Sequence, residues 1–337
     1  MTSMPNPTMP PEWAPQDRVW MAFPVPGYSL GETAEEADEA RTTWAAVANA
    51  CAAFEPVTVV VDPAEASAAQ KLLDPEVEIV EAPLDDAWMR DIGPTFVHTA
   101  DGSVAGVDWV FNGWGQSDWA TWDNDERIGS LVCDVAGVPR IASDLVNEGG
   151  GIHVDGTGLV LATETVQLGP GRNDSWAKEQ VEAELARTIG ATEVFWLPRG
   201  LARDYERYGT RGHVDIVTAF TSPGRVLLHA QQSPEHPDFE LSQSFRRLLA
   251  DRFEVVDIPA PATLRDTEGW VDWSYVNHLV VNDGVITCSF DDPHDAEAVA
   301  ILREAYPGRS VVTVDARPLF ARGGGVHCIT QQQPSPR

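Results

Sequence analysis

Four short polar segments of the sequence carry the side chains with the most distinctive chemistry. They read DDAWMRDIGP at 85–94, NEGGGIHVD at 147–155, GHVDIVTAF at 212–220 and GGGVHCIT at 323–330. Together these segments offer a thiol, an imidazole and three carboxylates. Such a set can support nucleophilic catalysis by a cysteine, with a histidine moving protons.

The first two segments supply carboxylates beside special backbone. Asp91 follows Arg90 and precedes a Gly-Pro turn, and a salt-bridged turn is the plainer alternative for that pair. Glu148 precedes three glycines, which leave the backbone free of side chains and open to a ligand. A simple bend with an exposed acid is the alternative for Glu148.

The third segment places His213 two residues before Asp215. On a strand, side chains alternate between faces, so this pair would project from the same face into one pocket. The same HVD triplet recurs at 153–155, so a structural or metal-binding role stays open for either copy.

The fourth segment places Cys328 directly after a glycine-rich stretch near the C-terminus. The other three cysteines, Cys51, Cys133 and Cys288, lie within helical or strand patterns and are expected to be small core residues. The four cysteines form no C-x-x-C pair, which argues against a zinc site or a disulfide framework.

A thiol with several carboxylates favours a particular kind of substrate. A guanidinium is a planar cation whose N–H groups match carboxylates in shape and charge. Its positive charge would also lower the pKa of a nearby thiol and so favour the thiolate. The four segments therefore predict a small cationic guanidine as the substrate.

Composition and charge agree with that prediction. The chain has 337 residues, of which 43% are hydrophobic and 22% charged, as in soluble globular proteins. Its formal charge of −29 argues against nucleic acids and anionic membrane surfaces as partners and favours small cations. The bland alternative is a solvated acidic surface that serves solubility.

The N-terminus has neither the basic nor the apolar region of a signal peptide. We interpret residues 1–12 as a proline-rich lead-in and expect a cytoplasmic protein without a membrane span. A homodimer stays open.

The segments with distinctive chemistry lie between repeated units. β-rich runs occur at 57–62, 104–110, 159–163, 225–229 and 285–289. Helical patterns follow at 64–73, 125–136, 175–189, 239–253 and 295–306. Closing strands are expected at 77–83, 138–144, 192–198, 253–259 and 310–316.

Five strand–helix–strand units cannot cover their own apolar faces, so we expect them to pack around a common axis. The predicted architecture is one α/β domain over residues 1–337, with pseudo-fivefold repeats around a central site. An open doubly wound sheet ranks lower, because no G-x-G-x-x-G follows the first strand.

The motifs also carry a family resemblance. WMRDIGPTF, NEGGGIHVDG, GHVD and GGGVHCITQQQP resemble the agmatine deiminase family, from about residue 13 to residue 334. That family belongs to the guanidine-modifying enzymes, which share a five-bladed α/β propeller. The resemblance implies a hydrolase that attacks the amidine carbon, converting agmatine to N-carbamoylputrescine and ammonia without a metal or an organic cofactor.

The resemblance also implies roles for individual residues. Cys328 would be the nucleophile, His213 the general acid and base, and Asp91 and Asp215 the guanidinium-binding carboxylates. Glu148 would be the acidic residue near the histidine. We further expect the substrate to contact Trp88, Trp114 and Arg211, together with Asp91 and Asp215.

Two flanking segments depart from the family pattern. The lead into the histidine reads RDYERYGTRGHVDI, and NHL stands at 277–279; both are expected to contact the substrate's tail. Arg211 would repel an aminobutyl cation if it pointed inward, or could pair with Glu206 or receive a substrate carboxylate. Free arginine, peptidyl-arginine and other alkylguanidines therefore remain alternatives to agmatine.

Two competing functions are weaker. An acidic polyamine or guanidine binder would normally be exported, and the lead-in lacks a signal peptide. A metal hydrolase could use His213, Asp215, His153 and Asp155. It would lack an H-E-x-x-H motif and would leave Cys328 without a role.

Overall fold

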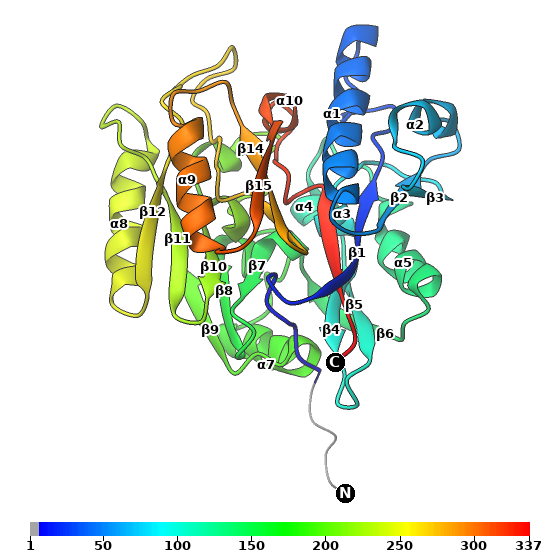
Figure 1. Cartoon of the computed structure of the whole chain (residues 1–337). Coiled ribbons are helices and arrows are strands. Elements are labelled where there is room, and N and C mark those ends of the chain that lie inside the picture. Colours follow the sequence, from blue (N-terminus) through cyan, green and yellow to red (C-terminus); the bar gives the residue numbers. More distant parts are fainter. Residues whose placement is uncertain (1–6) are drawn as a thin grey trace, which may run out of the picture.

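The computed structural model describes residues 7–337 (Figure 1). Residues 1–6 of the expected lead-in lie outside the described residues. The described strands form five separate sheets, whose strand orders are β16-β1-β2-β3, β4-β5-β6, β7-β8-β9, β10-β11-β12 and β13-β14-β15.

The strands are short and mostly buried. The first two sheets contain β16 (Thr330–Pro334), β1 (Gln16–Ala22), β2 (Val57–Val61), β3 (Glu78–Glu81), β4 (Thr95–His98), β5 (Val104–Val110) and β6 (Arg140–Val146). The other three contain β7 (Ile152–Val154), β8 (Leu159–Thr163), β9 (Glu193–Leu197), β10 (Thr218–Ser222), β11 (Arg225–Ala230), β12 (Glu254–Pro259), β13 (Leu279–Val281), β14 (Gly284–Ser289) and β15 (Ser310–Asp315).

The sheets share one pairing scheme. Each begins with an antiparallel pair, such as β4 with β5, and continues with a parallel pair, such as β5 with β6. In the first sheet the C-terminal strand β16 pairs antiparallel with β1, so that Val19 lies opposite Gln332. Parallel neighbours need a crossover connection, which explains the helix before each parallel strand.

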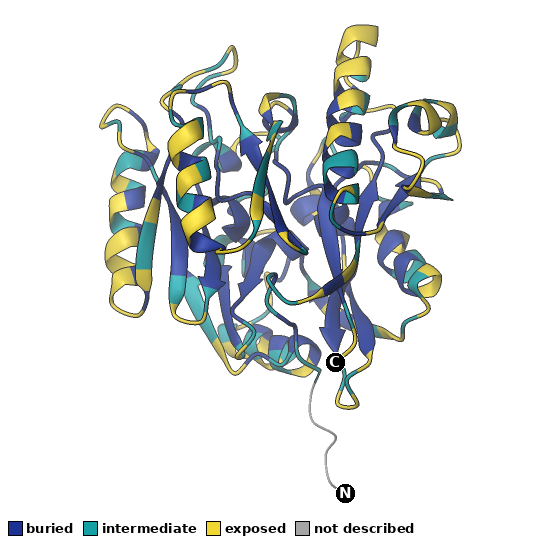
Figure 2. Ribbon diagram, in the orientation of Figure 1, coloured by how far each residue is buried: buried dark blue, intermediate teal, exposed yellow. Residues whose placement is uncertain are grey.

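The crossover helices lie on the outside of their sheets. They are α1 (Ala34–Ala52), α2 (Ala66–Leu72), α5 (Ile128–Ala136), α7 (Lys178–Ile189), α8 (Asp238–Ala250) and α9 (Asp295–Ala305). Figure 2 shows the outward faces of these helices exposed and the strands behind them largely buried. An amphipathic helix is expected in this position, because one face meets the sheet and the other meets water.

The five predicted strand–helix–strand units are confirmed, with boundaries shifted by a few residues. The doubly wound alternative is wrong, because the described strands form five sheets rather than one. The sequence interpretation missed α1, whose N-cap residue Thr33 forms a capping box with Glu36. It also missed short strands that precede the repeated units, such as the three-residue β7 and β13.

The polar segments form short helical turns and loops between the sheets. The short helices are α3 (Met89–Ile92), α4 (Gly113–Gln116), α6 (Glu164–Gln167) and α10 (Arg317–Phe320), with 3₁₀ turns η1 (Asp125–Arg127), η2 (Gly149–Gly151), η3 (Arg203–Tyr205) and η4 (Val214–Ile216). Of these, α3 contacts η2, η2 contacts η4, and α3 also contacts β16. Segments far apart in the sequence therefore meet at one place.

The described part of the N-terminal lead-in is tied to the body of the protein. The Thr8 amide donates to the His98 carbonyl, and the Met9 amide donates to the Ile189 carbonyl, each at 2.9 Å. These hydrogen bonds hold the segment that leads to Glu12, and Glu12 is only 5% exposed. Within residues 7–337, no helix is long and apolar enough to cross a bilayer.

Candidate active site

Cys328 lies in the turn that leads into β16 and is buried. The Nδ2 group of Asn277 donates to Sγ of Cys328 at 3.2 Å, and the Cys328 thiol lies 3.5 Å from Asp215 Oδ2. Burial, and then the charges of Asp215 and Asp91, raise the pKa of the Cys328 thiol well above its usual range. Cys328 is therefore a thiol when no cation lies beside it.

Asp91 lies on α3 and is held by two donors. The Trp114 indole donates to Oδ2 at 2.9 Å, and the Gly150 amide donates to Oδ1 at 3.2 Å. Burial raises the pKa of Asp91 to about 6, against the opposing charge of His213. Asp91 is thus a fixed carboxylate that ionises below neutral pH.

His213 lies at the start of η4, between two carboxylates. Its Nε2 is 3.3 Å from Glu148 Oε2, and its Nδ1 is 3.9 Å from Asp91 Oδ1. Burial alone would lower the pKa of His213, but Asp91 and Glu148 outweigh it and raise the pKa to about 9. At neutral pH His213 is therefore an imidazolium that can give up a proton.

The expected strand over His213 and Asp215 is wrong. Residues 214–216 form the 3₁₀ turn η4, and β10 begins only at Thr218. The turn is fixed by Asp204, whose carboxylate accepts from the amides of Gly212 at 2.5 Å and His213 at 3.2 Å. These backbone bonds replace the ladder that a strand would need.

Glu148 is ionised and immobile. The Arg172 Nε donates to its two oxygens at 2.9 and 3.0 Å, and both side chains are fully buried. Burial alone would raise the pKa of Glu148, but Arg172 and His213 outweigh it and lower the pKa to about 2. The sequence interpretation did not identify Arg172.

The glycine triplets bring backbone close to these side chains, as expected. A Cβ at Gly150 would lie 2.5 Å from His213 Nδ1 and 3.0 Å from Asp215 Oδ2. A Cβ at Gly324 would lie 2.7 Å from the Trp88 ring and 2.9 Å from the sulfur of Cys328. Side chains at these positions would displace the site residues.

Asp215 accepts from a histidine that sequence analysis did not single out. The His327 Nδ1 lies 2.8 Å from Asp215 Oδ2, while Asp215 Oδ1 has no hydrogen-bond partner within residues 7–337. Burial alone would raise the pKa of Asp215, but His327 outweighs it and lowers the pKa. One oxygen of this carboxylate is therefore fixed, and the other is left to accept from a ligand.

A narrow cavity of about 10 Å³ opens onto the sulfur. It is lined by Trp88, Asp91, Trp114, Trp119, Tyr208, Thr210, Arg322, Gly323 and Cys328. Rings that line it are stacked: Trp114 lies against Trp119 with centroids 5.2 Å apart, and Tyr208 lies against Tyr28 at 4.4 Å. Sequence analysis had found Trp88 and Trp114 but neither Trp119 nor Tyr208.

Two residues that were expected to contact the substrate's tail have protein partners of their own. Arg211 does not line the cavity, because its Nη1 donates to the Pro170 carbonyl at 3.0 Å in a separate pocket. Asn277, expected to contact the tail, is buried and contacts Cys328 instead. Its Oδ1 also accepts from the His327 amide at 2.9 Å, so Asn277 holds the turn around the nucleophile.

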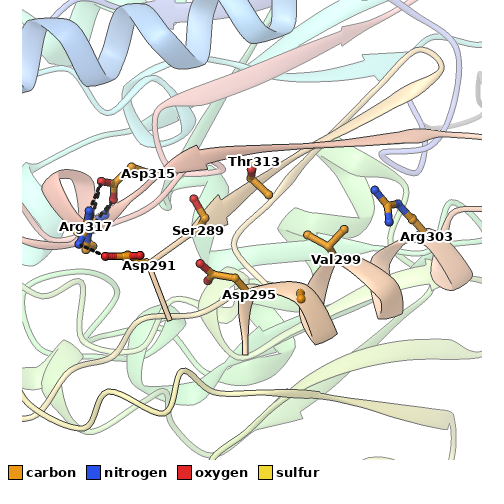
Figure 3. Close-up of a pocket in the computed structure, with 9 residues that line it drawn as sticks. Ser289, Asp291, Asp295, Val299, Arg303, Thr313, Asp315 and Arg317 are labelled. Atoms are coloured by element: carbon orange, nitrogen blue, oxygen red, sulfur yellow. Dashed lines mark hydrogen bonds and ion pairs between the residues drawn. The ribbon is translucent and has the colours of Figure 1, made fainter. Parts of the chain in front are cut away.

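A larger groove of about 640 Å³ lies elsewhere, between α9 and β15 (Figure 3). No cysteine or histidine lines it. Its Arg317 is paired with Asp315 at 2.7 Å and with Asp291 at 3.5 Å. The thiol of Cys328 and the carboxylate of Asp91 line the smaller cavity instead, so we place the thiol chemistry there.

The second HVD triplet has a different environment. Asp155 accepts from the Thr157 amide and hydroxyl and thus holds a turn after β7. His153 Nε2 lies 3.7 Å from Glu12 Oε1. Across residues 7–337, no three His, Cys, Asp or Glu side chains are grouped as ligands for a metal ion.

The comparisons with known proteins extend over nearly the whole chain. Residues 8–334 match the family described as Porphyromonas-type peptidyl-arginine deiminase. A Streptomyces coelicolor protein, provisionally named an agmatine deiminase, is 56% identical over 334 residues, covering 97% of this chain and 98% of its own. The agmatine deiminase of Pseudomonas fluorescens Pf-5 is 39% identical, with 98% of this chain and 96% of that protein covered.

A solved structure agrees with these sequence matches. The agmatine deiminase of Enterococcus faecalis is similar to this chain with a TM-score of 0.91 at 31% identity. The match covers 98% of this chain and 96% of that one.

Proposed function

The chain belongs to the family of Porphyromonas-type peptidyl-arginine deiminases, and on that basis we propose that it is an agmatine deiminase. The reaction hydrolyses agmatine to N-carbamoylputrescine and ammonia. One observation carries the proposal: a buried thiol, a cationic imidazole and two carboxylates, Asp91 and Asp215, are assembled from three distant segments.

Asp91 and Asp215 bind the guanidinium. Both carboxylates are buried, so the attraction to a planar cation is screened little by water. Asp91 is fixed by Trp114 and Gly150, and Asp215 presents an oxygen that receives no hydrogen bond from residues 7–337. Two fixed carboxylates orient the central carbon of the guanidinium for attack.

The substrate's charge activates the nucleophile. Burial, together with the charges of Asp215 and Asp91, holds the pKa of Cys328 high in the free enzyme. A guanidinium bound between them neutralises both and places positive charge near the sulfur, which lowers the pKa of the thiol. The thiol proton then leaves to solvent, and the Asn277 amide stabilises the thiolate by donating to it.

The chemistry has two stages. In the first, Sγ of Cys328 bonds to the guanidinium carbon, His213 gives its proton to a terminal nitrogen, and that C–N bond breaks to release ammonia. The sulfur then carries an alkylthiouronium. In the second stage, neutral His213 takes a proton from water and the hydroxide bonds to the same carbon. The C–S bond then breaks as the hydroxyl proton passes to the sulfur, which releases N-carbamoylputrescine and restores the Cys328 thiol.

The enclosure of the cavity favours a small substrate over peptidyl-arginine. Rings of Trp119 and Tyr208 line a cavity of only about 10 Å³, and Tyr28 packs against both rings, so side chains must move to admit even agmatine. A peptide would need a longer open groove. The formal charge of −29 further favours a dication over free arginine, whose carboxylate it repels.

We also propose that the five sheets are the blades of one propeller-like domain. Their shared pairing scheme supports this arrangement, because each would be one repeat. The contacts of α3, η2 and η4 support a central position for the site.

A product assay over a panel of guanidines tests the function. The purified protein, incubated with agmatine, arginine and an N-blocked arginine amide, is assayed for ureido products by colorimetry and for ammonia. We expect equal amounts of N-carbamoylputrescine and ammonia from agmatine. Turnover of the blocked arginine in preference to agmatine would contradict the proposal.

A further inference from the structure

A row of buried charged side chains runs from the N-terminal segment to the active site. His327 Nε2 lies 2.8 Å from Glu12 Oε1, and His327 Nδ1 lies 2.8 Å from Asp215 Oδ2. Glu12, His327 and Asp215 are all at most 5% exposed. An ionised carboxylate only accepts hydrogen bonds, so both ring nitrogens of His327 are donors and the ring is an imidazolium.

We propose that Glu12 is a positioning residue of the active site, which acts through His327 to hold Asp215 in the orientation that binds the guanidinium. The inference rests on the proposed function. Glu12 fixes one side of the imidazolium, and the other side fixes Oδ2 of Asp215. Oδ1 of Asp215, which has no partner within the described chain, then accepts from the substrate.

The charge on His327 depends on Glu12. Burial and the neighbouring Arg90 guanidinium lower the pKa of His327, while Glu12 and Asp215 raise it and together prevail. Arg90 donates to the His327 carbonyl at 3.2 Å, and its Nη1 is 3.9 Å from Glu12. Without the charge of Glu12, the charge of Asp215 would be left to oppose burial and Arg90.

The other groups near His327 do not replace Glu12. The His153 ring lies 6.4 Å from the His327 ring, and burial lowers the pKa of His278 to about 4 and keeps it neutral. The remaining charged or titratable neighbours that act on His327 or touch its segment are Arg90, Asp215 and Cys328. Loss of the Glu12 charge should therefore allow His327 to lose its proton near neutral pH.

The experiment measures agmatine binding without turnover. Calorimetric titration uses full-length Cys328→Ser protein, with and without Glu12→Gln, at about pH 6 and about pH 8.5. At the higher pH, Glu12→Gln should raise Kd about tenfold or more, because neutral His327 holds Asp215 less firmly. At the lower pH the loss should shrink to about threefold or less, because His327 regains its proton.

Two matched variants complete the design. Glu65→Gln also removes a buried, arginine-paired carboxylate, since Glu65 pairs with Arg41 at 2.7 Å, and should leave Kd within about twofold at both pH values. His327→Asn cannot be protonated in this range, so it should weaken binding equally at both. Thermal melting of each variant checks its fold.

Each outcome decides the inference. Equal binding by the Glu12→Gln and parent proteins, or an equal loss at both pH values, would overturn it while leaving the proposed function intact. Failure of the Cys328→Ser parent to bind agmatine would instead contradict the proposed function.

If Glu12→Gln does not fold, ¹⁵N NMR of the parent protein provides the test. The His327 signal, assigned with His327→Asn, should show two protonated ring nitrogens at about pH 8. A neutral ring at that pH would overturn the inference.

Discussion

Nε2 of His213 lies 3.3 Å from Oε2 of Glu148, whose two oxygens are in turn bound by the guanidinium of Arg172. Glu148 is therefore an anion with a fixed position, and it holds a proton on His213 at neutral pH. The two functions of His213 as acid and then as base depend on this pairing.

The pH profile of kcat/KM should be bell-shaped, because it reports groups of the free enzyme. Asp91, with a pKa of about 6, must be ionised to bind the cation, so activity falls as pH drops through that value. His213, with a pKa of about 9, must be protonated to release ammonia, so activity falls as pH rises through that value. Steady-state rates over this range test both limbs; a flat profile would contradict the assignments.

Glu148→Gln should move the alkaline limb to lower pH by about one unit or more. Without the negative charge of Glu148, burial lowers the pKa of His213 further. Glu164→Gln, which removes a half-exposed carboxylate paired with Lys178, is the control and should leave the limb in place. An unchanged alkaline limb in Glu148→Gln would show that Glu148 does not set the pKa of His213.

Asn277→Ala should lower kcat/KM for agmatine by about tenfold, the value of one hydrogen bond to a charged group. The Asn277 amide donates to the sulfur of Cys328, and its loss destabilises the thiolate. Asn49→Ala, which removes an amide that donates to the Leu72 carbonyl away from the site, is the matched control. Rates of the Asn277 variant equal to those of the control would refute this role.

Gly150→Ala should reduce kcat/KM by about a hundredfold, because the new Cβ would lie 2.5 Å from His213 Nδ1 and displaces the ring. Gly137→Ala provides a contrast: its φ of 67° makes alanine costly, but among residues 7–337 no atom beyond the adjoining backbone lies within 4 Å of the added Cβ. That variant should lose thermal stability and keep its rate. Full activity of Gly150→Ala would mean that His213 is not confined as described.

Agmatine should be preferred over free arginine by about a hundredfold in kcat/KM, because the acidic protein repels the substrate carboxylate. Arg211→Ala should change neither rate by more than about twofold, since Arg211 donates to the Pro170 carbonyl in a separate pocket. Loss of arginine turnover in this variant, with a gain for agmatine, would place Arg211 at the substrate.

The repeated α/β units could be predicted because each depends on local patterns. The runs VTVVV and LVLAT are apolar except for one threonine each and are buried along their whole length, as is typical of strands covered on both faces; a helical pattern follows the first of them. The HVD segment has the same local character as a strand. This segment forms a 3₁₀ turn instead, because its backbone amides donate to the carboxylate of Asp204, nine residues before His213. Local residue propensities do not predict that hydrogen bond.

The candidate site could be predicted only in part, for a similar reason. Cys328, His213, Asp91 and Glu148 each lie within three residues of a glycine, and glycines mark unusual backbone in a sequence. Glu12 and His327 are 315 residues apart, and their contact exists only because β16 pairs with β1. The sequence around Arg172 does not indicate a role in the site either, because that role comes from its ion pair with the buried Glu148 carboxylate.

Substitution of the cysteines tests whether Cys328, rather than another cysteine, is the nucleophile. Cys328→Ser should abolish turnover of agmatine. Replacing Cys51, Cys133 and Cys288 together with alanine should leave most of it, because these thiols are buried and burial raises the pKa of each. Circular dichroism of both proteins checks that they fold; an inactive but folded triple variant would place the nucleophile elsewhere.

The most direct test of the central claim is to trap the covalent intermediate. Wild-type protein mixed with agmatine is quenched rapidly in acid and digested, and its peptides are measured by mass spectrometry. We expect the Cys328 peptide to gain the mass of agmatine less ammonia, and we expect no other peptide to gain it. Active protein whose Cys328 peptide stays unmodified while another carries the adduct would contradict the claim.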